Sequence, residues 1–105
     1  MKKEFCVVMT NAVSADEAEK MADVLLDEKL ASCIQILPVS NVYKMNGKKN
    51  KSQEFLLMIK TRTDLFSELE AFIKSNCSYD IPQIIALPIT YGSYEYLSWI
   101  NAETK

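Results

Sequence analysis

The chain has 105 residues, of which 49% are hydrophobic and 25% charged, with only two Gly and three Pro. This composition is typical of one compact folded domain over residues 1–105, and it excludes a disordered or collagen-like chain. The sequence contains no His, which excludes Ser-His-Asp and Cys-His catalysis, His-ligated zinc and imidazole pH switches. The net charge of -2 gives the whole protein no electrostatic attraction to nucleic acid or anionic lipid.

The three cysteines, Cys6, Cys33 and Cys77, are odd in number, widely spaced and without a C-x-x-C pair. Free thiols in this pattern are typical of a reducing compartment, so we expect a cytoplasmic protein. Met1-Lys2-Lys3 precedes an apolar run that is too short for a secretory signal. No run reaches the roughly 18 apolar residues of a membrane span, so we expect no membrane partner.

The first predicted elements are a strand and a helix. Phe5–Met9 is a short, β-favouring apolar run that predicts a strand buried on both faces. Ser14 and Glu17 have the spacing of a capping box, and apolar residues then recur at helical spacing. We therefore expect an amphipathic helix over Ser14–Glu28.

A long β-hairpin follows. Ala31–Met45 has an extended pattern, with Pro38 at a bulge or an edge position. Asn46-Gly47 is typical of a two-residue type I′ turn, which needs positive φ at both residues. The return strand is expected over Gln53–Thr61.

The second half of the chain predicts a helix, a strand and a last helix. Thr63 or Asp64 caps the second helix, Gln83–Ile89 is the fourth strand, and Ser93 caps the C-terminal helix. The order β-α-β-β-α-β plus a helix is that of the α+β, ferredoxin-like split βαβ fold. In this fold two helices lie on one face of a four-stranded antiparallel sheet.

The length of the hairpin predicts an oligomer. Fifteen residues of strand over Ala31–Met45 would span about 50 Å, whereas a globule of this size is only about 33 Å across. A protruding ribbon would expose apolar side chains and unpaired edges, so we expect a second copy of the chain to cover it. The residues expected at this interface are Val39, Val42, Tyr43 and Met45, together with Trp99 from a C-terminal aromatic cluster.

Four segments together resemble the divalent-cation tolerance protein CutA family. They are Leu30–Ile36, Tyr43–Lys48, Glu54–Arg62 and Tyr79–Ile89. The resemblance covers nearly the whole chain and implies a ferredoxin-like protomer in a homotrimer held by extended hairpins. It also implies a cytoplasmic protein that is linked to copper and other divalent ions. We do not expect an enzyme, because the two Gly stand alone at turns and form no phosphate-binding loop.

The chain departs from the family pattern at three places. Cys77-Ser78-Tyr79-Asp80 stands where the family usually has His-Pro-Tyr-Glu, Gln83 replaces a usual Glu, and Met45 replaces a usual Trp. A thiolate in place of imidazole favours soft ions, particularly Cu(I), over zinc. Cys77 is therefore a candidate copper ligand, with a neutral replacement as the alternative.

The other two cysteines are weaker candidates for metal ligands. Cys33 matches a cysteine of the family and is a second candidate ligand, although free Cys often simply packs in a core. Cys6 lies within an apolar strand and is expected in the core. Intervals of 27 and 44 residues separate successive cysteines, so only folding or assembly would bring metal ligands together.

Glu54 and Lys60 bracket the apolar return strand and share one face of it, because they are six positions apart. One interpretation is a salt bridge or solvated strand ends. The other, carried over from the resemblance, is a ligand pocket at a subunit boundary. Its lining residues would be Lys60, Glu54, Tyr79, Asp80 and Gln83.

The residues support two functions of different class. The first is a trimeric, cytoplasmic protein of divalent metal tolerance that binds copper weakly or as Cu(I). The alternative is a regulatory module, similar to the PII signalling proteins, that binds a small ligand or a partner protein at subunit clefts. A lysine cluster at the hairpin tip lacks Arg and stacking aromatics, so we expect a solvated tip and no nucleic-acid partner.

Overall fold

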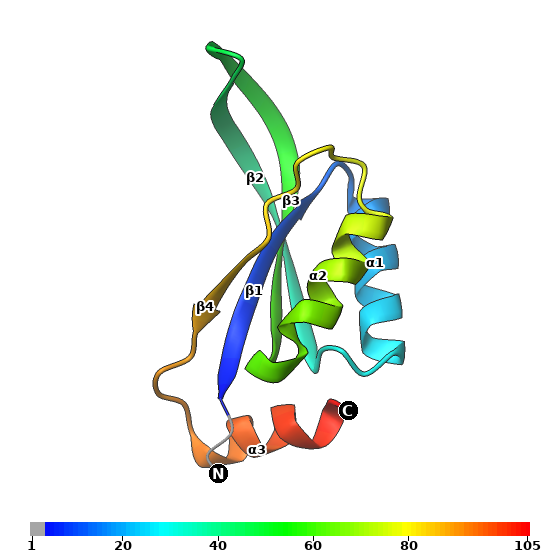
Figure 1. The fold of residues 1–105 in the computed structure, drawn as a ribbon, viewed down its shortest axis with the longest axis vertical. Helices are drawn as coiled ribbons and strands as arrows, with labels where there is room; N and C mark the ends of the chain where they lie inside the picture. The colour runs from blue at the N-terminus through cyan, green and yellow to red at the C-terminus, as the bar shows by residue number, and fades with distance from the viewer. Residues whose placement is uncertain (1–3) are drawn as a thin grey trace.

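The computed structural model describes residues 4–105, so Met1-Lys2-Lys3, weighed above as the start of a secretory signal, lies outside the described residues. The element order confirms the ferredoxin-like prediction with its C-terminal helix (Figure 1). The elements are β1 (Phe5–Ala12), α1 (Ala15–Asp27), β2 (Cys33–Met45), β3 (Lys48–Arg62), the 3-10 turn η1 (Thr63–Leu65), α2 (Phe66–Asn76), β4 (Ile85–Pro88) and α3 (Tyr94–Glu103).

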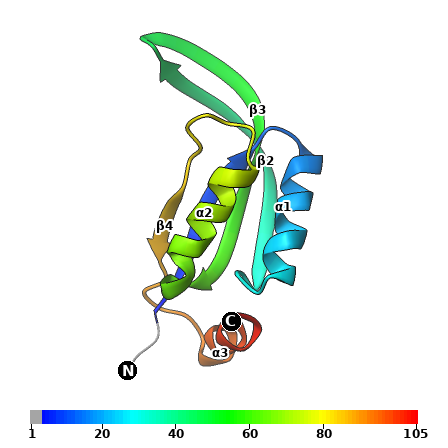
Figure 2. The same cartoon turned by 45° about the vertical axis from the view of Figure 1, so that its right-hand side comes forward.

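The four strands form one antiparallel sheet in the order β2-β3-β1-β4. Helices α1 and α2 lie together on one face of it, and α3 crosses the end where β1 begins (Figures 1 and 2). The fully buried side chains between the sheet and these two helices include Val8, Leu25, Leu57, Ile59, Leu69 and Ile73. We call the other side of the sheet the open face, because neither α1 nor α2 covers it.

Strand β1 is longer than predicted and is buried mainly on one side. Cys6 and Val8 face the helices and are buried, whereas Phe5, Val7 and Met9 alternate with them and are partly exposed. The prediction of burial on both faces is therefore wrong for the single chain, because the odd-numbered side chains lie on the open face.

The capping of α1 is confirmed, with one change of partner. Ser14 is the N-cap, and its hydroxyl accepts a hydrogen bond of 3.1 Å from the backbone N–H of Glu17. The Glu17 carboxylate accepts in turn from the N–H of Val13 at 2.9 Å. In the usual capping box this carboxylate accepts from the N–H of the N-cap residue itself, here Ser14, so the hydrogen bond is shifted by one residue towards the N-terminus.

The predicted cap of α2 is wrong. Thr63 and Asp64 lie inside η1, and neither boundary residue, Arg62 or Leu65, makes a side-chain capping hydrogen bond. The chain enters α2 through a 3-10 turn in which the N–H of Phe66 bonds to the carbonyl of Thr63. Asp64 pairs instead with Arg62 at 3.0 Å.

The hairpin turn is confirmed as type I′, with φ of +54° at Asn46 and +77° at Gly47. Strand β3 begins directly after it, five residues earlier than the predicted Gln53. Pro38 pairs with Phe55 in an unbroken register, so it occupies an edge strand and no bulge. The two strands extend well past the helices in Figure 1, and the longest dimension of the molecule is 46 Å.

Strand β4 is shorter than predicted. It covers only Ile85–Pro88, so Gln83 and Ile89 fall outside it. Gln83 belongs instead to the loop that joins α2 to the sheet. This loop runs beside the base of the hairpin in Figure 1 and supplies the residues considered next.

Candidate functional site

The candidate site is centred on the carboxylate of Glu54. Strand β1 ends opposite Phe55, so Glu54 lies where the hairpin leaves the sheet. The side chain is only 6% exposed. Asn11 donates to it at 2.7 Å and Asn41 at 3.2 Å, and the Ser52 hydroxyl makes a short contact with the same carboxylate. The carboxylate is thus held by donors from β1, β2 and β3.

These hydrogen bonds keep Glu54 ionised. Burial raises the pKa of this carboxyl, but the hydrogen bonds from Ser52, Asn11 and Asn41 outweigh burial, and the pKa falls below its ordinary value. Tyr79 lies close by, and its pKa is raised by burial and by the negative charge of Glu54. The site therefore holds a carboxylate and a neutral phenol at neutral pH.

A cavity of about 150 Å³ opens above this carboxylate, and we call it the Glu54 pocket. Its polar lining comes from both the sheet and the loop after α2. The lining residues are Asn11, Asn41, Tyr43, Met45, Glu54, Tyr79, Ile81 and Gln83. Exposed apolar and aromatic side chains at Tyr43, Met45 and Ile81 make the rim, with exposures of 36%, 50% and 81%.

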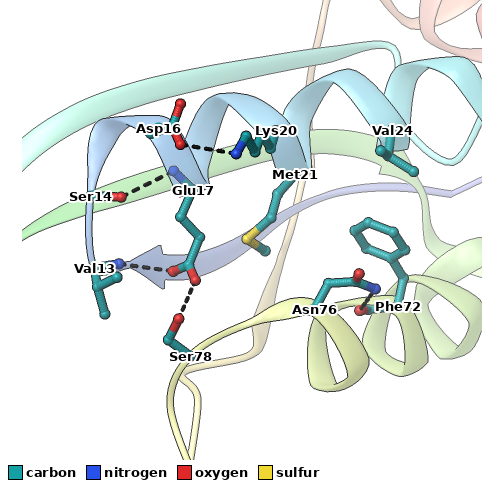
Figure 3. A pocket seen from close by; sticks show the side chains of 10 residues that line it. All are labelled: Val13, Ser14, Asp16, Glu17, Lys20, Met21, Val24, Phe72, Asn76 and Ser78. Atoms are coloured by element: carbon teal, nitrogen blue, oxygen red, sulfur yellow. Dashed lines mark hydrogen bonds and ion pairs between the residues drawn. The ribbon is translucent and has the colours of Figure 1, made fainter.

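The loop that carries Tyr79 is held by the start of α1. The Ser78 hydroxyl donates to the Glu17 carboxylate at 2.5 Å, and the same carboxylate accepts from the N–H of Val13 (Figure 3). A second hollow, of about 430 Å³, lies beside this contact, between α1 and α2. Glu17 thus connects the start of α1 to Ser78, the residue before Tyr79.

The structure brings together some of the residues proposed for the pocket. Glu54, Tyr79 and Gln83 all line it, whereas Asp80 is exposed and is not a lining residue. Lys60 is six residues along β3, or about 20 Å away. Its ammonium group donates to Gln35 at 2.6 Å and lies 6.0 Å from the centre of the Tyr96 ring.

The structure does not bring the two candidate metal ligands together. Cys33 starts β2 and is paired in register with Lys60. Cys77 follows α2, packs against the core, and its thiol donates to the carbonyl of Tyr79 at 3.5 Å. Within residues 4–105 there is no group of three or more Cys, Asp or Glu that could hold a metal ion. Cys6 is 2% exposed, as expected for the core.

The residues expected at a subunit interface occupy three places. Val39, Tyr43 and Met45 are on the open-face side of the hairpin, because alternate residues of β2 share a face. Val42 points to the other side of the ribbon and is 62% exposed. Trp99 is 41% exposed on α3, with its ring 5.6 Å from that of Tyr96.

Sequence reasoning missed the three residues that hold Glu54. The hairpin turn itself contains a signal for two of them, because a two-residue turn at Asn46-Gly47 sets Asn41 opposite Ser52, next to Glu54. Asn11 has no comparable local signal. It reaches Glu54 only through the pairing of β1 with β3, which joins residues 43 positions apart.

Comparison with known families identifies the chain. A model of the family described as "CutA1 divalent ion tolerance protein" matches residues 6–103. The chain belongs to this CutA1 family. The resemblance seen in four segments is thereby confirmed.

The similar proteins come from plants, bacteria and archaea. The chain is 40% identical over 100 residues to "Protein CutA, chloroplastic" of Arabidopsis thaliana, covering 94% of this chain and 55% of the plant protein. It is 37% identical over 99 residues to the "Divalent-cation tolerance protein CutA" of Thermus thermophilus, covering 93% and 96%. The chain thus spans about half of the length of the plant relative and nearly all of the bacterial one.

Solved CutA1 structures have the same fold. The structure of the "Periplasmic divalent cation tolerance protein CutA" of Archaeoglobus fulgidus matches with a TM-score of 0.94 at 36% identity. That match covers 96% of this chain and 99% of the archaeal one. CutA1 of Oryza sativa also matches with a TM-score of 0.94, at 37% identity, over 97% and 94% of the two chains.

The family model and several of these CutA1 relatives are described by tolerance of divalent ions. Their descriptions place individual relatives in the chloroplast or the periplasm. In the described part of this chain, no helix is long and apolar enough to cross a membrane.

Proposed function

We propose that this CutA1-family chain contributes to divalent metal tolerance as a cytoplasmic homotrimer that binds copper weakly, as Cu(I), through Cys77. The observation that carries the tolerance function is the family match over residues 6–103. The copper site rests on the thiol that replaces the usual imidazole, since thiolates prefer Cu(I) to harder ions. Cys33 is the second candidate ligand, contributed by a different copy of the chain.

The placement of the thiols supports weak binding. Cys77 is half-buried in a loop and has one close polar neighbour, the carbonyl of Tyr79. Cys33 lies at the other end of the sheet, so the two thiols of one chain do not chelate one ion. A site with a single thiolate from each chain gains little from preorganisation.

The homotrimer and the compartment rest on separate observations. The open face and the hairpin carry exposed apolar side chains that an assembly would cover. Cys6, Cys33 and Cys77 are all free thiols, which is typical of a reducing compartment.

Competition for Cu(I) against a chromophoric chelator tests the copper site on reduced protein. We expect Cys77→Ala to weaken Cu(I) binding by about tenfold or more, because it removes the only thiolate of that loop. Cys33→Ala tests the second ligand in the same titration. An affinity unchanged by Cys77→Ala would contradict the assignment of Cys77.

A second function, regulation through a small ligand in the manner of PII proteins, is favoured by one observation. The Glu54 pocket places a buried carboxylate, a phenol and two amides around one cavity at the base of the hairpin. A thermal-shift screen of metabolites, nucleotides and metals would separate the two functions, since a ligand that prefers the folded state raises the melting temperature.

A further inference from the structure

Within residues 4–105 of a single chain, no cationic side chain pairs with the buried carboxylate of the Glu54 pocket. The Glu54 side chain is 94% buried, since only 6% of it is exposed, and its hydrogen-bond partners are the neutral side chains of Asn11, Asn41 and Ser52. None of the pocket's lining residues is Lys or Arg. The four ion pairs found within residues 4–105 do not include Glu54. A buried charge is costly unless it is paired, so this site favours an added positive charge.

Two buried oxygen atoms in the same pocket keep free acceptor positions within the described residues. The side-chain oxygen of Asn11 makes no hydrogen bond within the described chain, although Asn11 is only 7% exposed. The orientation of this amide is set by its nitrogen, which donates to Glu54. The Tyr79 hydroxyl is likewise buried, and it interacts with the Glu54 carboxylate, to which only its O–H can donate. The Asn11 oxygen can only accept, and the Tyr79 oxygen still accepts when its own O–H is directed at Glu54, so both positions suit a donor of hydrogen bonds.

The arrangement of donors around Glu54 discriminates between kinds of cation. Both carboxylate oxygens already accept N–H or O–H groups, and a metal ion would compete with these donors for the same oxygens. A metal ion would have to displace these donors. A guanidinium or primary ammonium group instead brings several N–H donors and no acceptor, which matches the free oxygens of Asn11 and Tyr79.

The residues at the rim of the pocket can contact the alkyl part of such a ligand. Met45 and Ile81 offer apolar contact to a short alkyl chain, and the Tyr43 ring adds a face that attracts cations. The cavity of about 150 Å³ is of the size that admits a molecule such as benzene. A ligand of a few non-hydrogen atoms therefore fits.

We propose that the Glu54 pocket binds a small organic cation, a guanidinium or primary ammonium group on a short alkyl chain. This proposal rests on the regulatory function above, of which it names the ligand class. It is independent of copper binding at Cys77. Glu54 supplies the charge, and Asn11 and Tyr79 supply the acceptors.

The test is a titration of the isolated, full chain with methylguanidinium, followed by NMR of the side-chain amides of Asn11 and Asn41. We expect saturable shifts of these amides, and none with methylurea, which has nearly the same shape but no charge. Glu54→Gln should weaken binding by about tenfold or more, because hydrogen bonds to charged groups are the strong ones. Tyr79→Phe, which keeps the charge, should weaken binding as well, and Glu19→Gln on the exposed face of α1 should not.

Five results would overturn the proposal. Equal binding of methylurea and methylguanidinium would show that charge is not recognised, and so would an unchanged affinity in Glu54→Gln. Shifts of these amides caused only by Mg²⁺ or Cu(I) would make the pocket a metal site. Binding of a neutral or anionic metabolite there, without methylguanidinium binding, would refute the ligand class but leave the regulatory function standing. If no ligand shifts these amides, both the ligand class and the regulatory function fail.

Discussion

At the scale of single residues, the candidate site depends on how Glu54 is held. Burial alone would push this carboxyl towards its neutral form, whereas donors from three different strands favour the anion. Because the pKa is lowered on folding, the ionised side chain stabilises the native state. This contribution is fully present above the pKa of the unfolded chain and is lost as the pH falls through the pKa of the folded chain.

Glu54→Gln is therefore expected to make the free energy of unfolding less dependent on pH in the acid range. Urea unfolding at fixed protein concentration, measured between about pH 5 and pH 3, should show a smaller loss of unfolding free energy in Glu54→Gln than in the unmodified chain. Glu19→Gln, on the exposed face of α1, is the matched control and should leave the slope unchanged. Identical slopes for Glu54→Gln and the unmodified chain would contradict the lowered pKa.

At the scale of elements, the hairpin is both the most regular part of the chain and the part with the least support from its own protomer. Its register is fixed by the turn at Asn46-Gly47 and runs without interruption from Met45↔Lys48 to Cys33↔Lys60. Near Glu54 the two strands extend past the helices, so beyond that point cross-strand pairs, the turn and the loop after α2 beside the base support the ribbon.

Gly47→Ala is expected to destabilise the protein by about 1 kcal/mol, because a side chain at positive φ is strained. An added Cβ at this position meets nothing within 4 Å, so the loss reflects the backbone alone. Urea unfolding measures this loss of stability. Asn46→Gly, at the other central position, should bring no such loss. Equal stability of Gly47→Ala and the unmodified chain would argue against a type I′ turn in solution.

At the scale of the whole molecule, the two faces of the sheet differ in what covers them. One face is sealed by α1 and α2, while the open face keeps Leu37, Ile85 and Leu87 between 41% and 48% exposed. Exposed apolar side chains on an uncovered sheet face are typical of a subunit interface. The proposed homotrimer would cover it together with the protruding hairpin.

A matched pair of substitutions tests this assembly. Leu37 on the open face is 41% exposed and Leu26 on α1 is 42% exposed, so the two differ in location and hardly in exposure. We expect Leu37→Glu to reduce the mass in light scattering from about three chains towards one, since a carboxylate would be buried at the interface. Leu26→Glu should leave the mass unchanged. A monomeric mass for the unmodified chain at micromolar concentration would refute the homotrimer.

The sequence by itself determined most of the local structure of this protein. Helix α1 was predictable because Ser14 and Glu17 act within one turn, and the hairpin because Asn46-Gly47 sets the pairing of its two strands. The start of α2 was predicted wrongly, because a 3-10 turn replaced the expected side-chain cap. Such local rules depend on residues close together in the chain, and they fail where a competing local geometry satisfies the same backbone groups.

Only the tertiary structure decided the composition of the site. Glu54 and Lys60 share a strand face in the sequence pattern, yet they have different partners in the structure. Lys60 contacts Gln35 and Tyr96, whereas Glu54 accepts a hydrogen bond from Asn11. The contact of Asn11 with Glu54 joins positions 43 residues apart, and that of Ser78 with Glu17 joins positions 61 apart. No local periodicity predicts contacts between residues so far apart in the sequence, because these contacts depend on how the helices and strands pack together.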